Sequence, residues 1–352
     1  MRSSIATRPW IVLPQQPLKF YTEHQTFQRS IISYTTTPGS LQLSNNTMAS
    51  QTLTGTTSTS KPDLEPSITS AWQTSDVPQR YKAAENATRP FAKTMVDLSE
   101  ELTTIKTAPA RIFDLGCGTG AVEAELYAAV KREQWDGLSV LAGDISQPML
   151  EYLKARGKNE GWSGLETRVV DGMKLDLADE PGFEHVFVSF AIFVLPSDVT
   201  AKLAAKVKTG GTLAISTWAN MPWYDLLGRT YARMQDGPDL PSREQLWASF
   251  TNSRPWNEAT FVRRQLEDAG LGRVEVTQKK INVECGTPDI FMTTMGFMLG
   301  MLSKQWPEEK RAEWARDVAR TMKGILVEDA GGEGKSVFMD FEGIVGVGVK
   351  EE

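Results

Sequence analysis

The sequence predicts an α/β protein with a doubly wound, mostly parallel seven-stranded sheet and a helical lid. From residue 72 onwards, short apolar runs of strand character alternate with helical stretches, which is typical of parallel sheets with right-handed crossovers. A turn with three glycines in five positions, Gly116, Gly118 and Gly120, joins the first of these strands to a helix. After Trp218 the alternation gives way to Trp- and Met-rich helical segments.

The first 66 residues differ in composition from the rest of the chain. They are rich in Ser, Thr, Gln and Pro and show no sustained periodicity, which predicts a disordered leader. Because this segment contains Arg and few acids, a mitochondrial presequence is the alternative to a dispensable leader on a cytoplasmic protein. Met48 is a second candidate start.

The remaining residues, 67–352, are predicted to form one domain. It begins with a helix over 80–102 and continues with helices between five strands. A helical lid insertion over about 221–256, a helix over 258–269 and a second lid insertion over about 288–327 follow. The predicted strands are 111–115, 138–143, 166–170, 184–190, 211–217, 273–283 and 337–349.

Composition excludes several classes of protein. The net charge of −6 provides no electrostatic footprint for a nucleic acid. Two cysteines, Cys117 and Cys285, do not make a disulfide framework and fit a reducing compartment. The longest apolar run, 186–195, is about half as long as a bilayer-spanning helix, so no membrane partner is expected.

The glycine turn indicates a ligand site. At the carboxyl end of a parallel strand, such a turn is expected to offer unpaired backbone N–H groups at a helix N-terminus. Gly116, Gly118 and Ala121 formally satisfy the dinucleotide pattern G-x-G-x-x-G/A, which keeps a nicotinamide-dependent oxidoreductase as an alternative. However, Asp114 directly precedes the turn, and an anion there favours a cationic ligand such as S-adenosylmethionine over a diphosphate.

The segment "DLGCGTG" (114–120) resembles the first motif of class I S-adenosylmethionine-dependent methyltransferases, and the similarity extends through most of residues 80–349. The resemblance implies that Asp144 binds the ribose hydroxyls and that Asp171 and Met173 contact the adenine. Taken alone, Asp171 is also explained as a helix cap. The cofactor-binding residues implied in this way are Tyr81, Asp114, Gly116, Gly118, Gly120, Asp144, Ile145, Asp171, Gly172 and Met173.

The acceptor pocket is predicted to be aromatic, which suits an apolar or aromatic small molecule. The alternative is that Trp223 and Trp247 only pack the lid onto the sheet. The face formed by Met292, Met295, Met298 and Leu302 is expected to be core. The predicted wall residues are Phe190, Phe193, Trp218, Met221, Trp223 and Trp247.

A histidine base is not expected at the site. His24 lies in the leader, and His185 opens the fourth strand at the end of the sheet opposite the ligand. Tyr81, Tyr224 and Asp225 are the candidate proton acceptors. The fourth strand ends in "SFAIFVLP", without the carboxylate that metal-dependent relatives would need, so no metal is predicted. These features favour an acceptor that ionises easily, such as a thiol, an enol or an acidic amide, or else a free amine.

A finer resemblance is to small-molecule methyltransferases of fungal secondary metabolism, especially thiol-methylating enzymes. It rests on "RYKAAENATRPFAKTMVD", "GWSGLETRVVD" and "HVFVSFAIFVLP" followed by "GGTLAISTW". The predicted reaction is methyl transfer to sulfur, with nitrogen or oxygen of a polyketide or tetramic-acid type product as the alternative. An oxidoreductase and a catalytically silent binding module are the competing classes. The scaffold, the number of methyl groups and the oligomeric state do not follow from the sequence.

Overall fold

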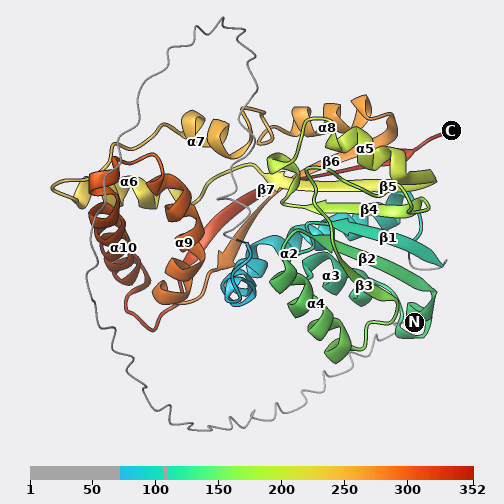
Figure 1. Cartoon of the computed structure of the whole chain (residues 1–352), viewed down its shortest axis with the longest axis horizontal. Helices are drawn as coiled ribbons and strands as arrows, with labels where there is room; N and C mark the ends of the chain where they lie inside the picture. Colours follow the sequence, from blue (N-terminus) through green and yellow to red (C-terminus); the bar gives the residue numbers. More distant parts are fainter. Residues whose placement is uncertain (1–71, 106–108) are drawn as a thin grey trace, which may run out of the picture. The chain divides into compact units, whose positions relative to one another are not determined.

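A seven-stranded sheet organises the protein. The computed structural model describes residues 72–105 and 109–352, and within them the strand order is β3-β2-β1-β4-β5-β7-β6 (Figure 1). The predicted seven-stranded, mostly parallel sheet is confirmed. The strands are β1 (Ala110–Leu115), β2 (Leu138–Asp144), β3 (Leu165–Val169), β4 (Phe183–Ser189), β5 (Val207–Trp218), β6 (Leu271–Glu284) and β7 (Phe338–Lys350).

The first five strands are all parallel, and β1 lies between β2 and β4. β7 then pairs antiparallel with both β5 and β6, so one reversed strand is inserted between β5 and the edge strand β6. Most strand ends lie within two residues of the predicted bounds. β5 is the exception, because it begins at Val207, four residues before the predicted start.

Helices cover both faces of the sheet. Figure 1 shows α5 and α8 on one side and α2, α3 and α4 on the other. Local sequence explains the bounds of α4: Ser146 accepts the Met149 N–H as an N-cap, and Gly161 ends the helix at φ +73°. The helices are α2 (Val77–Leu102), α3 (Ala121–Ala129), η1 (Arg132–Gly137), α4 (Gln147–Glu160), η2 (Ile192–Val194), α5 (Val199–Lys206), α6 (Tyr224–Arg233), α7 (Arg243–Phe250), α8 (Ala259–Asp268), α9 (Pro288–Ser303) and α10 (Glu308–Ala330).

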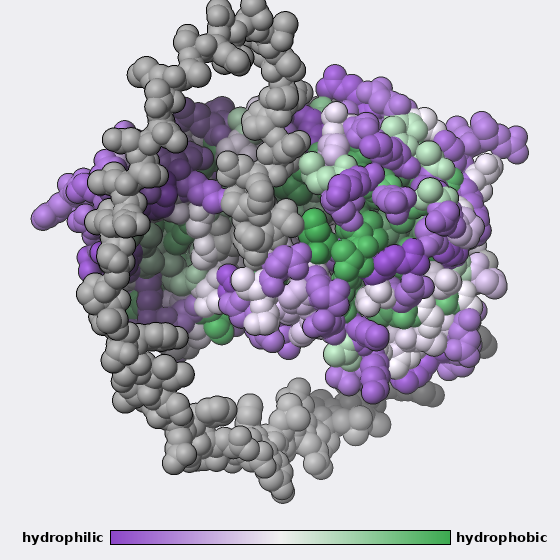
Figure 2. Space-filling model, in the orientation of Figure 1, coloured by the Kyte–Doolittle hydropathy of each residue, from purple (hydrophilic) through white to green (hydrophobic). Residues whose placement is uncertain are grey.

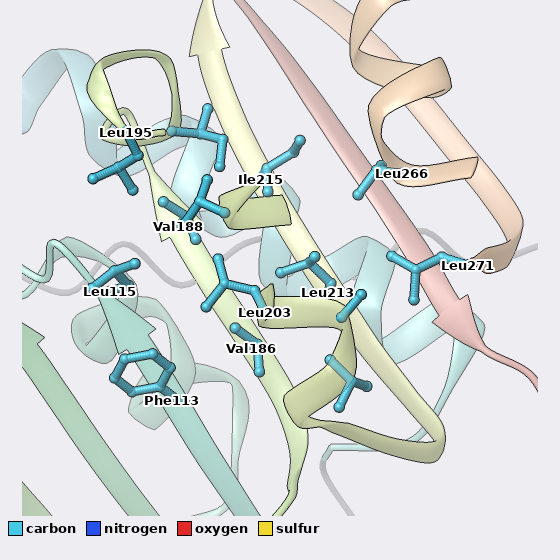
Figure 3. Packing of buried hydrophobic residues seen from close by; sticks show 14 of the residues in the cluster. Phe113, Leu115, Val186, Val188, Leu195, Leu203, Leu213, Ile215, Leu266 and Leu271 are labelled. Atoms are coloured by element: carbon cyan, nitrogen blue, oxygen red, sulfur yellow. The ribbon is translucent and has the colours of Figure 1, made fainter. Parts of the chain in front are cut away.

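The sheet separates two apolar cores. Alternate residues of a strand point to opposite faces, so Leu213 and Ile215 of β5 join one core and Ala214 joins the other. Figure 3 shows the first core, in which side chains of β1, β4 and β5 pack against Leu203 of α5 and Leu266 of α8. This packing holds the carboxyl ends of β1, β2 and β4 in fixed positions.

A third core, here called the helical core, is built from α6, α7, α9 and α10 together with the ends of β6 and β7. Met295 and Leu302 are buried in it, and Met292 and Met298 pack against it. The prediction that this methionine face is core is confirmed. The helical segments fall within or close to the two predicted lid insertions.

The predicted leader, residues 1–66, lies outside the described residues, and so does His24. Cys117 and Cys285 are free, buried thiols. Of the helices that the structure describes, none has both the length and the hydropathy needed to span a bilayer. In the space-filling view, apolar residues gather in one area of the visible face within a largely hydrophilic surround (Figure 2).

Candidate functional site

The glycine loop, residues 116–120, joins β1 to α3 and has a backbone that only glycine adopts without strain. Gly116 and Gly120 have φ values of +74° and +91°. A Cβ at Gly120 would lie 2.4 Å from the Leu153 side chain, and one at Gly116 would lie 2.8 Å from the Ala191 Cβ. The loop therefore packs tightly against Leu153 of α4 and against Ala191, which follows β4.

The backbone N–H groups of this loop are mostly used inside the protein. Gly116 and Cys117 donate to the Gly143 carbonyl at 2.7 and 3.1 Å, and Gly120 donates to the Cys117 carbonyl at 2.9 Å. Gly118 donates to Oδ2 of Asp144 at 2.9 Å. The prediction of unpaired donors is thus wrong for these four residues. Because a diphosphate needs such donors, the loop does not suit a dinucleotide.

Asp144 ends β2 and holds two loops together. Its Oδ2 accepts the Gly118 N–H, and its Oδ1 accepts the Ser146 N–H at 2.8 Å. Burial raises the pKa of this carboxyl, and the N–H donors oppose that rise. Each oxygen keeps a further lone pair, so the half-buried carboxylate can still accept two hydroxyl donors of a ligand. Beside it, Ile145 accepts a hydrogen bond from the side chain of Gln73 at 2.8 Å through its carbonyl oxygen.

Tyr81 of α2 lies over the loop. Its ring carbon would be 3.7 Å from a Cβ at Gly118, and its ring packs edge-on against Trp72 with centroids 5.8 Å apart. Burial raises the pKa of the Tyr81 phenol to about 12, and the carboxylates of Asp144 and Glu85 add to the rise. The phenol is therefore protonated near neutral pH. Its position supports a contact with a ligand, while the pKa opposes a role as proton acceptor.

A hydrogen-bond network that the sequence did not predict ties α2 to the glycine loop; we call it the loop clamp. Glu85 of α2 accepts hydrogen bonds from the Thr119 hydroxyl and from the Arg156 guanidinium of α4, both at 2.9 Å. Arg156 also donates to the Thr119 carbonyl at 2.8 Å and to the Gly120 carbonyl at 3.4 Å. No local pattern in the sequence predicts this clamp, because its residues are 34 to 71 positions apart.

Asp114, the anion before the loop, lies in the interior of the protein. It is 1% exposed, and its carboxyl lies next to that of Glu123 in the first turn of α3. Burial raises the pKa of Asp114 well above its usual range. Glu123 was missed by the sequence interpretation. Its position three, four and seven residues before Leu126, Tyr127 and Val130 places it on the buried face and could have revealed it.

Asp171 follows the end of β3 and forms a local turn. Its Oδ1 accepts the Met173 N–H at 3.0 Å, and Lys174 lies 3.4 Å from its Oδ2. A Cβ at Gly172 would lie 2.7 Å from Leu195, so the backbone packs closely there. Met173 is 41% exposed and is free to pack against a planar ligand. The turn explanation and a contact with adenine are compatible, because Oδ1 has a second lone pair.

Two of the predicted wall residues stack on one another. The rings of Phe190 and Trp218 are 3.8 Å apart at 25°, and Phe91 of α2 meets Phe190 edge-on at 5.4 Å. Phe190 has a φ of +52°, which is strained for a phenylalanine, and its N–H donates to the Ser216 hydroxyl at 3.1 Å. Strain of this kind at the end of β4 is typical of ligand sites.

The other predicted wall residues do not join this stack. Met221 and Trp223 are buried in the helical core and Trp247 packs against that core, as the lid-packing alternative expects. Phe193 packs against the two cores of the sheet. Trp218 contacts both the helical core and the core beneath α2, so it is the residue that connects the two groups.

The remaining candidate bases have other partners. The Tyr224 hydroxyl donates to the Pro241 carbonyl at 2.9 Å, and Asp225, with an 81% exposed side chain, forms an ion pair with Arg243. These contacts give both residues other partners, and their role as proton acceptors stays a prediction. His185 is buried in β4 with Nδ1 2.8 Å from the Thr212 hydroxyl, and burial lowers its pKa to about 4. Its structural role is confirmed.

The fold and this site are compatible with an S-adenosylmethionine-dependent methyltransferase, and the comparisons with known proteins support that class. The residues present fit that cofactor, because the loop offers close backbone approach beside carboxylates and no nest of free donors for a phosphate. Residues 112–211 match the family model Methyltransf_25, a methyltransferase domain. The match begins in β1 and ends in β5, so it contains the glycine loop and Asp144.

Several relatives of the chain are fungal methyltransferases. The chain is 26% identical to the methyltransferase ktnA of Aspergillus niger, over 74% of this chain and 90% of the relative. It is 24% identical to the acetylaranotin bis-thiomethyltransferase of Aspergillus terreus, over 71% of this chain and 86% of the relative. A solved methyltransferase, phosphoethanolamine N-methyltransferase 2 of Haemonchus contortus, aligns with a TM-score of 0.42 at 15% identity, covering 74% and 53% of the two chains.

Proposed function

We propose that the protein transfers a methyl group from S-adenosylmethionine to a heteroatom of a small secondary metabolite, with a thiol as the preferred acceptor. Bound S-adenosylmethionine supplies an activated methyl group that leaves by in-line displacement. The observation that carries the proposal is the glycine loop with Asp144 across it, where a carboxylate is held by two backbone N–H groups beside bare backbone.

In this proposal, Asp144 binds the ribose and Asp171, with Met173, holds the adenine. Tyr81 covers the loop from α2 and excludes water from it. The stacked pair Phe190 and Trp218 forms the wall between sheet and lid. Residues 67–352 are the catalytic domain, with the segments about 221–256 and 288–327 as its lid.

The preference for sulfur rests on the lack of a base. Among the residues that the structure describes, the sole histidine is His185, which is neutral and buried in the sheet. A thiol has an ordinary pKa near 8.5, so an appreciable fraction ionises without a protein base. One relative is named a bis-thiomethyltransferase, which supports the same choice. Amines and acidic hydroxyls are the second candidates, since they also react without a strong base.

The test is mass spectrometry of products after incubation of the full chain with S-adenosylmethionine and one of three acceptors: a reduced cyclic dithiol, a tetramic acid or a phenol. We expect methylation of the dithiol. Methylation of the tetramic acid or the phenol alone would keep the cofactor site and overturn the acceptor. Binding of S-adenosylhomocysteine, measured separately, distinguishes a wrong acceptor from a wrong cofactor.

A further inference from the structure

Two carboxyl groups face one another beneath the glycine loop, and the proposed reaction uses neither directly. Asp114 belongs to β1 and Glu123 to α3, and they are 1% and 0% exposed. Within the described part of the chain, none of the four carboxyl oxygens has a well-formed hydrogen bond, and only Glu123's own backbone N–H lies near its carboxyl group. Buried polar atoms normally have partners, so four unpartnered oxygens at one place need an explanation.

The explanation is a proton between the two groups. The two carboxyl groups lie next to each other, and two ionised carboxylates cannot form a hydrogen bond because neither has a donor. One proton supplies the donor and removes one of two charges that the interior would otherwise hold. Burial raises the pKa of both carboxyl groups, and repulsion from Glu123 adds to the rise at Asp114, so the pair favours holding a proton.

The surrounding charges do not neutralise the pair. Asp144 of β2 is a further anion near Asp114. Arg156 of α4 attracts Glu123, but its guanidinium is already engaged by Glu85 of α2 in the loop clamp. The pair with its proton therefore keeps one negative charge, close to a second one on Asp144.

The thiol of Cys117 in the loop is affected by the same negative charges. Burial and the three carboxylates around it raise its pKa well above the usual range, so this group stays neutral and does not take the charge of the pair. A cation that binds on the loop is then the available means of stabilising a second ionised carboxylate beneath it.

We propose that Asp114 and Glu123 share one proton beneath the glycine loop, and that binding of a cationic sulfonium nucleoside expels this proton to solvent. The inference rests on the proposed cofactor site. Glu123 acts through Asp114 and does not contact the ligand, so it is a positioning residue that sets the charge of the site. Cofactor binding is consequently coupled to pH.

The sign of this coupling follows from mass action. Because binding releases a proton, affinity rises with pH as long as the free protein holds that proton, by up to about tenfold per pH unit for one proton released. Above the pH at which the pair in the free protein loses its proton, affinity no longer changes with pH through this pair. Glu123→Gln replaces the shared proton with a permanent N–H donor, so Asp114 stays ionised and the contribution disappears.

The experiment is calorimetric titration of S-adenosylmethionine into the full chain in two buffers of different ionisation enthalpy. The wild type is expected to release a substantial fraction of one proton, and Glu123→Gln is expected to bind with that release removed. Glu125→Gln is the matched control, two residues along α3, because Glu125 pairs with Arg89 and lies outside the pair. Equal release from wild type and Glu123→Gln overturns the proposal.

A second readout needs no variant, and its first part is made on the free protein. The infrared carbonyl band of a protonated carboxyl group is expected in the free wild-type protein and is expected to vanish when the cofactor binds. A free protein without this band overturns the shared proton. If the band is present but S-adenosylmethionine does not bind, the pair stands and the proposed function fails.

Discussion

The glycine loop and the helical core are built on different principles. At the loop, nearly every backbone group has a defined partner, and charged side chains from β2, α2 and α4 fix its atoms. The helical core consists of methionine, tryptophan and leucine side chains that satisfy one another by packing. A site that must hold a particular charged ligand restricts residue identity at each position. Apolar packing restricts volume instead, so many sequences satisfy it.

Of the substitutions that test this difference, Asp144→Ala is expected to have the largest effect, which is on cofactor affinity. Asp144→Ala removes the acceptor of the Gly118 and Ser146 N–H groups and the proposed acceptor of the ribose hydroxyls. Because charge-assisted hydrogen bonds contribute about 1.5–3 kcal/mol each, affinity for S-adenosylhomocysteine should fall by about 100-fold or more. Calorimetry measures this loss. Asp198→Ala, at an exposed ion pair with Lys202, should leave affinity unchanged, and retained affinity in Asp144→Ala contradicts the site assignment.

A smaller effect is expected from the loop clamp. Glu85→Gln leaves the Arg156 guanidinium buried without its carboxylate partner, which should lower the free energy of unfolding by about 3 kcal/mol and weaken cofactor binding. Arg89→Gln, four residues along α2, breaks an ion pair whose arginine is half exposed and should change stability by under about 1 kcal/mol. Urea unfolding compares the two variants. Equal losses would mean that the clamp does not hold the loop.

The smallest effects on stability are expected from conservative substitutions of apolar residues. Such substitutions show most clearly whether the glycine loop or the helical core shapes the cofactor site. Met295→Leu in the helical core and Leu153→Met beneath the loop should each change stability by less than about 1.5 kcal/mol. Only Leu153→Met is expected to reduce cofactor affinity, because Leu153 packs directly under Gly120. An equal response of affinity to both exchanges would show that the helical core also shapes the cofactor site.

The local pattern of the sequence predicted much of the fold. Alternation of apolar runs with helical stretches placed all seven strands, including β6 and β7, whose antiparallel pairing follows the parallel part. The helix predicted over 80–102 begins three residues earlier, at Val77, where Pro78 suits the first helical turn. These features depend on neighbours in the chain, which is why periodicity reveals them.

The parts of the site that were missed depend on residues far apart in the chain. Glu85 and Arg156 meet because α2 and α4 pack on the same side of the sheet, and neither position stands out among the other charged helix residues. The residues predicted to form one pocket wall fall into two groups for the same reason. Phe190 and Trp218 stack together, whereas Trp223 and Trp247 pack in the helical core. Local patterning does not say which of two adjacent cores an aromatic residue joins.

By itself, the sequence determined the class of fold, the position of the glycine loop and the carboxylate at the end of β2, because these depend on short segments with strict conformational demands. The tertiary structure alone decided what the loop offers. Its N–H groups donate to Gly143 and Asp144, and Asp114 is buried next to Glu123. Both outcomes arise because backbone donors and buried charges take the partners that packing brings within reach, and no spacing along the chain specifies those partners.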